Sequence, residues 1–119
     1  MKKVNVLGTE YTVNKYDYSD QSIFKKRGII GYSDDILHEI GICNMRTHPD
    51  YKDDSEEWCK ILEKQILRHE IVHAFFSESG LQDSASQFVG AWSKNEEMVD
   101  WVAVQLPKIF KAFEEAGAL

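Results

Sequence analysis

A long helical pattern that carries two histidines and a glutamate limits the fold of this chain more than any other feature. Apolar residues recur with helical spacing over about 54–79, and Gly80 then marks the expected end of the helix. His69 and His73 lie one turn apart on one face, within the apolar stretch 66–76. Burying a neutral polar group without a partner costs roughly 2–7 kcal/mol, so these side chains need partners inside the protein.

The segment His69-Glu70-Ile71-Val72-His73 has the spacing with which a helix binds one zinc ion. His69 and His73 would supply two imidazole ligands, and Glu70 would stand beside them as a general base. A hydrolytic site also needs a third protein ligand and one open position for water. The alternative is that both histidines are ordinary helix residues and that Glu70 pairs with a nearby cation.

The acidic segment Asn95-Glu96-Glu97-Met98-Val99-Asp100 offers the third ligand. Asp100 is the one charged residue in the apolar run 98–104, and a carboxylate in such a place often accepts a hydrogen bond from a ligating imidazole. Glu96 lies one turn earlier on the same face, whereas Glu97 lies about 100° round the helix. This favours Glu96 as the ligand, although Glu96 could instead close a capping box with Ser93.

The rest of the chain predicts a small sheet and a second helix. Alternating residues over 4–13, with Gly8 at the turn, predict a β-hairpin, and 36–43 reads as a third strand. Between these strands, 14–31 reads as a long connection and Gly31–Asp35 as a turn. Asp54 with Glu57 forms a capping box, and a connection over 80–92 with a short helical piece leads to a helix over 93–106. Pro107 kinks that helix or starts a new one, and 108–116 is an amphipathic stretch. We therefore expect one α+β domain over residues 1–119, with a three-stranded antiparallel sheet packed on the histidine helix and the glutamate helix behind.

Composition narrows the partners and the compartment. The 119 residues suit one domain, and a net charge of −6 argues against nucleic acid or an anionic membrane as the main partner. No apolar core follows the charged start, and no run reaches membrane-spanning length, so we expect a cytoplasmic protein. Cys43 and Cys59 follow no CxxC spacing, and we expect free, partly buried thiols.

The stretches 68–75 and 95–101 together resemble the gluzincin zinc peptidases, whose third-ligand motif is Asn-Glu-x-x-x-Asp. The residues in and around these two motifs are similar to those of small phage and prophage-borne peptidases and, more loosely, to those of the ImmA/IrrE-type peptidases that cleave repressors. The resemblance implies a minimal zincin-like domain with Zn²⁺, in which Glu96 is the third ligand and Asp100 supports a histidine. It also implies a protein or peptide substrate, possibly a repressor, and the host cytoplasm if a phage encodes the chain.

The chain departs from the large gluzincins, because it lacks their second subdomain and an obvious downstream group that would polarise the substrate carbonyl. Four residues earlier in the chain offer such a group: Tyr32, His38, His48 and Tyr51. We expect a monomer or weak oligomer. The competing hypothesis is a non-enzymatic zinc-containing phage or prophage protein that binds a protein partner, with a closed four-ligand site that recruits His48 or Cys43.

Overall fold

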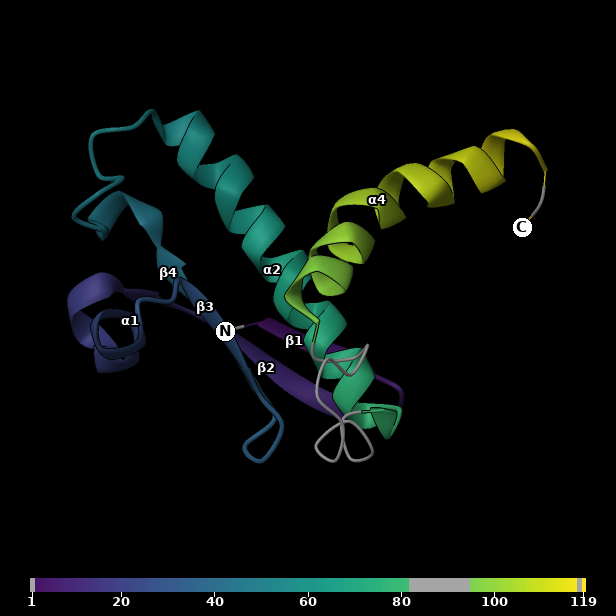
Figure 1. Ribbon diagram of the computed structural model, residues 1–119, viewed down its shortest axis with the longest axis horizontal. Helices are drawn as coiled ribbons and strands as arrows, with labels where there is room; N and C mark the ends of the chain where they lie inside the picture. Colours follow the sequence, from purple (N-terminus) through teal and green to yellow (C-terminus); the bar gives the residue numbers. More distant parts are fainter. Residues whose placement is uncertain (1, 82–94, 118) are drawn as a thin grey trace.

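The computed structural model describes residues 2–81, 95–117 and 119, and in these ranges the protein is α+β (Figure 1). The strands are β1 (Lys2–Val6), β2 (Thr9–Asp17), β3 (Gly31–Asp34) and β4 (Glu39–Asn44). The α-helices are α1 (Ser22–Arg27), α2 (Glu56–Glu78) and α4 (Glu96–Glu115), and the 3₁₀ helices are η1 (Tyr18–Asp20) and η2 (Met45–Thr47). No helix in the described part of the chain is both long and apolar enough to cross a membrane.

The sheet has four strands in the order β1-β2-β4-β3 and is mixed, so the predicted three-stranded antiparallel sheet is wrong. The β1–β2 hairpin is confirmed, with Leu7 and Gly8 at positive φ in its turn. The predicted connection over 14–31 contains the end of β2, then η1 and α1. This crossover brings β4 back parallel to β2, while β3 pairs antiparallel with β4 at the edge.

The β3–β4 hairpin explains why the sequence pattern placed the third strand too early. Residues 31–34, predicted as part of a turn, form β3, whose four residues are all half-buried and mostly polar. Ile36 and Leu37 were expected in the next strand, but they lie at the hairpin tip with 82% and 74% of their surface exposed. Their backbone N–H groups both donate to Asp34 Oδ1 at 2.9 Å. This local turn therefore overrides the apolar pattern.

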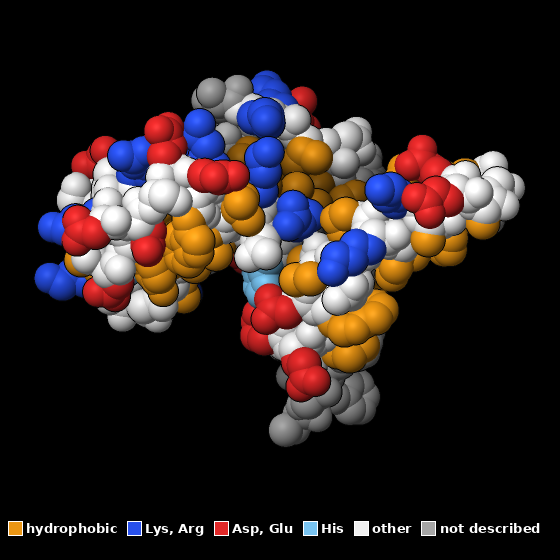
Figure 2. Space-filling view, turned by 90° about the horizontal axis from the view of Figure 1, so that it is seen from above, with side chains coloured by type: hydrophobic (Ala, Val, Ile, Leu, Met, Phe, Trp, Pro, Cys, Tyr) orange, Lys and Arg blue, Asp and Glu red, His pale blue; other side chains and the backbone are white. Residues whose placement is uncertain are grey.

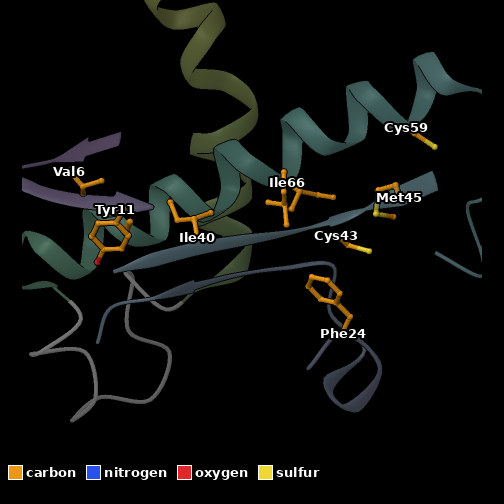
Figure 3. Packing of buried hydrophobic residues seen from close by; sticks show 10 residues of the cluster. Val6, Tyr11, Phe24, Ile40, Cys43, Met45, Cys59 and Ile66 are labelled. Carbon is orange, nitrogen blue, oxygen red and sulfur yellow. The ribbon is translucent and has the colours of Figure 1, made fainter. Parts of the chain in front are cut away.

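Helix α2 lies across one face of the sheet, and α4 packs on α2 and then extends away from the sheet (Figure 1). Figure 3 shows Ile40 and Ile66 between the sheet and α2, whereas Phe24 and Cys43 lie on the opposite side of the sheet. The buried core residues of this cluster are Val6, Tyr11, Phe24, Ile40, Ile42, Cys43, Met45, Cys59, Ile66 and Ala74. Both faces of the central strand β4 are therefore covered.

Two contacts fix α2 against the sheet. The buried carboxylate of Glu63 accepts hydrogen bonds from Met45 N at 2.9 Å and from Lys15 Nζ at 3.1 Å, which ties α2 to η2 and β2. At Gly31, a Cβ atom would lie 2.6 Å from Ile66 Cγ2 and 3.3 Å from Glu70 Cγ. The edge strand can approach α2 this closely only because residue 31 has no side chain.

The helix ends agree with the sequence in part. Gly80 has φ +87° just after the last residue of α2, as predicted. The predicted cap of α2 at Asp54 is wrong by one residue, because Ser55 Oγ accepts from Trp58 N at 3.1 Å. Helix α4 is capped by Asn95, whose Oδ1 accepts from Met98 N at 3.2 Å.

Two other predictions concern the region around α4. The predicted connection lies largely outside the described residues, as do Ser93 and its capping box. Helix α4 runs through Pro107 to Glu115, so the amphipathic stretch continues the same helix instead of starting a new one.

A carboxylate network lies on the sheet face away from α2. Glu39 accepts hydrogen bonds from Tyr16 at 2.6 Å, and from Tyr32 and Asn14 at 2.7 Å. Burial by itself would raise the pKa of Glu39, but these three hydrogen bonds outweigh it and hold the pKa below its usual value. The ring of Tyr32 reaches Glu39 across Gly41, where a Cβ would lie 2.2 Å from Tyr32 Cζ.

Gly31→Ala should destabilise the protein by roughly 1–3 kcal/mol, the usual cost of overpacking. The new methyl group would meet the stiff, β-branched side chain of Ile66. Urea unfolding followed by circular dichroism measures the change. Gly8→Ala, at an open turn position with φ +93°, is the reference for a substitution that adds backbone strain without overpacking. An unchanged unfolding midpoint for Gly31→Ala would show that β3 does not press against α2.

Glu39→Gln should lower the free energy of unfolding at pH 7, and the difference from wild type should shrink towards about pH 3. Because the pKa of Glu39 is lowered by folding, its ionised form stabilises the fold above the unfolded pKa of about 4.3. That contribution is lost as the pH falls through the folded pKa. Glu10→Gln removes an exposed pair with Lys3 and should have little effect. An equal loss for Glu39→Gln at both pH values would contradict the prediction.

Candidate metal centre

Three potential ligand groups lie on consecutive turns of α2. Donor atoms of His69, Glu70 and His73 all lie within 4.8 Å of one another. The two imidazole rings are tilted edge to face, with centroids 4.8 Å apart. Glu70 is buried, and only 22% and 16% of the His69 and His73 side chains are exposed. The helix therefore presents two imidazoles to one small, largely enclosed space.

The first turn of α4 brings a fourth group to the same place. Glu96 Oε2 lies 3.0 Å from His69 Nε2, and Glu96 Oε1 lies 3.1 Å from His73 Nε2. One carboxylate thus bridges the two nitrogens that face away from the α2 backbone. The structure brings together the three residues that the sequence suggested as ligands, although they come from separate helices.

Asp100 contacts the other side of the His69 ring. Its Oδ1 lies 2.6 Å from His69 Nδ1, one helical turn beyond Glu96. A carboxylate that accepts the Nδ1 proton leaves Nε2 as the nitrogen available to a metal. The structure thus brings Asp100 into contact with His69, and its role as the support of a ligating histidine stays a prediction.

Burial and charge shift the proton affinities in this cluster. Burial raises the pKa of Glu70 to about 7, and the negative charges of Glu96 and Asp100 add to the rise, while His69 opposes it. Burial also lowers the pKa of His73, against the influence of Glu96. A neutral imidazole is the form that binds metals.

The donor set fits zinc. Two imidazole nitrogens converge on one carboxylate, which is a ligand combination found in hydrolytic zinc sites. The buried Glu70 has a carboxylate oxygen within 4.8 Å of both imidazole donors. The thiols of Cys43 and Cys59 are free and buried in the hydrophobic core. The residues that would hold zinc are therefore His69, His73 and Glu96.

The cluster opens into a cleft of about 720 Å³. Figure 2 shows a histidine side chain at the foot of this hollow, with hydrophobic side chains on one wall and acidic side chains beside it. Of the four residues considered for polarising a carbonyl, His48 and Tyr51 line the cleft. The other two are engaged elsewhere, since Tyr32 donates to Glu39 and His38 packs on Tyr11 with ring centroids 5.2 Å apart.

Sequence reasoning missed several residues around the cluster. Tyr18 also lines the cleft, and a second cavity of about 180 Å³ joins Glu70 and His73 to Ser33, Asp35 and Ser77. Ser77 Oγ donates to Asp35 Oδ2 at 3.0 Å. The spacing of Ser77, four residues after His73 on the same helix face, was a signal in the sequence. Nothing in the sequence indicated that the β3–β4 hairpin would reach this point.

Comparison with protein-family models, curated proteins and solved structures found no match for this chain. The resemblance to gluzincins therefore stays a prediction from the motif residues.

Glu96→Ala should abolish tight zinc binding, and Asp100→Asn should weaken it by roughly 10–100-fold, as is usual when the partner of a ligating histidine is lost. Glu97→Ala is the matched control, because the neighbouring acid should leave affinity nearly unchanged. Zinc titration against a competing chromogenic chelator measures all three. Loss of zinc in Glu97→Ala together with retention in Glu96→Ala would show that Glu96 serves only as a helix-end residue.

Proposed function

We propose that this protein is a zinc-dependent metallopeptidase of gluzincin type that hydrolyses a peptide bond in a specific protein substrate. The observation that carries the proposal is the Glu96 carboxylate, held between the Nε2 atoms of His69 and His73, with the buried Glu70 beside them and a cleft open to solvent. Zinc bound by this ligand set would act as a Lewis acid and lower the pKa of a water molecule.

Each residue then has a defined task. His69, His73 and Glu96 would hold the metal, and Asp100 would keep the His69 ring in the orientation that directs Nε2 inward. Glu70 would accept a proton from the attacking water and later give it to the leaving amine. The side chain of Glu70 suits this task because it lies beside the ligands and lines the cleft.

The substrate class follows from the edge of the sheet. β3 is the last strand in the sheet order and is paired with β4 on one side. Its first residue, Gly31, lines the cleft beside Glu70. An extended peptide that pairs with this edge would pass over the candidate ligands. A flexible protein segment, such as one in a repressor, fits this geometry better than a folded surface.

One observation favours a second candidate, a zinc-containing protein that binds a partner without catalysis. Helix α4 exposes several large apolar side chains, among them Trp101 at 57%, Phe110 at 53% and Phe113 at 48%. Apolar side chains grouped on one exposed helix are typical of protein-binding surfaces. In this alternative zinc would stabilise the packing of α4 on α2.

Glu70→Gln should keep the zinc and the fold but lose hydrolysis, because a general base contributes about 10²–10⁴-fold to the rate. The measurement is cleavage of a proteome-derived peptide mixture by zinc-loaded protein, with products identified by mass spectrometry. Glu57→Gln is the matched control at an exposed position on the same helix and should leave activity unchanged. If wild type and Glu70→Gln give the same products at the same rate, Glu70 is not the base and the peptidase proposal fails.

A further inference from the structure

We infer that the cleft selects substrates by a large, neutral apolar side chain that lies about three to five residues from the cleaved bond. The selecting surface is the aromatic end of the cleft, which is formed by Tyr18, His48 and Tyr51. This inference rests on the proposed peptidase function and adds to it a substrate class.

The three rings of the aromatic end form a continuous surface. The ring centroids of Tyr18 and His48 are 4.7 Å apart, and those of His48 and Tyr51 are 4.9 Å apart. Tyr51 stacks in turn on Trp58 of α2, with centroids 5.6 Å apart and planes 20° apart. The rings are half-buried, so each retains area that another apolar side chain can cover.

Hydrogen bonds hold this surface in place without the substrate. Thr47 Oγ1 accepts from Tyr18 N at 2.9 Å and donates to Asn44 O at 2.6 Å, which joins η1 to η2. His48 Nδ1 accepts from Asp50 N at 3.1 Å, which fixes the imidazole ring. A pre-formed surface of this kind loses little conformational entropy when it binds a side chain.

The length of the cleft sets the position that is selected. On α2, the aromatic end lies against Trp58, on which Tyr51 stacks, and the cleft lining begins at Leu62 one turn later. Trp58 and Leu62 lie eleven and seven positions before His69, which corresponds to about 16 Å and about 10 Å of helix at 1.5 Å per residue. An extended peptide covers these distances with about three to five residues at ~3.3 Å each.

The chemistry of the lining sets the kind of side chain. Ile29, Leu62 and Ile66 provide apolar lining, and Figure 2 shows hydrophobic side chains along one wall of the hollow. Lys25 and Asp50 also line the cleft, and their charges have opposite signs. They give no net preference for a charged group. A phenylalanine, tyrosine, tryptophan, leucine or isoleucine in the substrate fits this lining best.

The test uses the full-length, zinc-loaded protein and a proteome-derived peptide library, with cleavage sites read by mass spectrometry. We expect large apolar residues to be enriched by at least roughly 10-fold at one position about three to five residues from the cut. Tyr18→Ala and Tyr51→Ala should reduce that enrichment while zinc content stays the same. Tyr16→Ala is the matched control, since Tyr16 contacts Glu39 on the opposite face of the sheet.

Cleavage without such a preference, or a preference that both tyrosine variants retain, would overturn the inference and leave the peptidase function standing. If zinc-loaded wild type cleaves nothing, the proposed function fails, and binding decides the inference. The probe is then a pair of otherwise identical seven-residue peptides with Phe or Ala at the central position, followed by NMR of labelled protein. Shifts at Tyr18, His48 and Tyr51 with the Phe peptide alone would support the aromatic end as a binding site, and their absence would overturn it.

Discussion

The close approach of α2 to the edge strand at Gly31 is the contact on which the rest of the structure depends. With no Cβ at this position, β3 lies against Ile66 and Glu70, and Glu70 is only 5% exposed. The same approach brings the free edge of the sheet to the cleft. A larger residue at position 31 would move the strand outward, admit water to Glu70 and separate the edge of the sheet from the histidines.

The candidate centre uses two glutamates in very different surroundings. Glu70 is buried beside the histidines, whereas 65% of the Glu96 side chain is exposed at the start of α4. An exposed carboxylate can turn between a bridge to two imidazoles and a metal without a large desolvation penalty. A buried carboxylate exchanges a proton more readily near neutral pH, because burial raises the pKa of Glu70 to about 7, as the proposed role of a base requires. The surroundings of the two glutamates therefore fit the roles proposed from the sequence motifs, with the buried Glu70 as the base and the exposed Glu96 as the ligand.

The sequence predicted correctly those features of the fold that depend on residues close together in the chain. The first hairpin, the end of α2 at Gly80 and the shared face of His69 and His73 follow from local rules of turn and helix geometry, and the structure has all three. The contact between Asp100 and His69 was also expected, but the apolar run around Asp100 suggested a buried acid, whereas 66% of its side chain is exposed.

What the sequence did not predict depends on contacts between distant segments. β3 has no alternating apolar pattern, and it is a strand because it pairs with β4 and rests on α2 through Gly31. The parallel pairing of β2 with β4 depends on the path of the intervening crossover. The rings of Tyr18, His48 and Tyr51 come together only when η1 and η2 meet, which no local spacing reveals.

The two cysteines give the protein built-in reporters of how its layers separate. Cys43 lies on the sheet face near Phe24, and Cys59 lies in the first turns of α2, and neither has exposed surface (Figure 3). Burial also raises the pKa of Cys43 to about 11, so its reactive thiolate is scarce in the folded state. A thiol reagent can therefore modify each cysteine only as fast as its own layer opens. The modification rates of Cys43 and Cys59 thus report separately on the opening of the two sides of β4, without any introduced label.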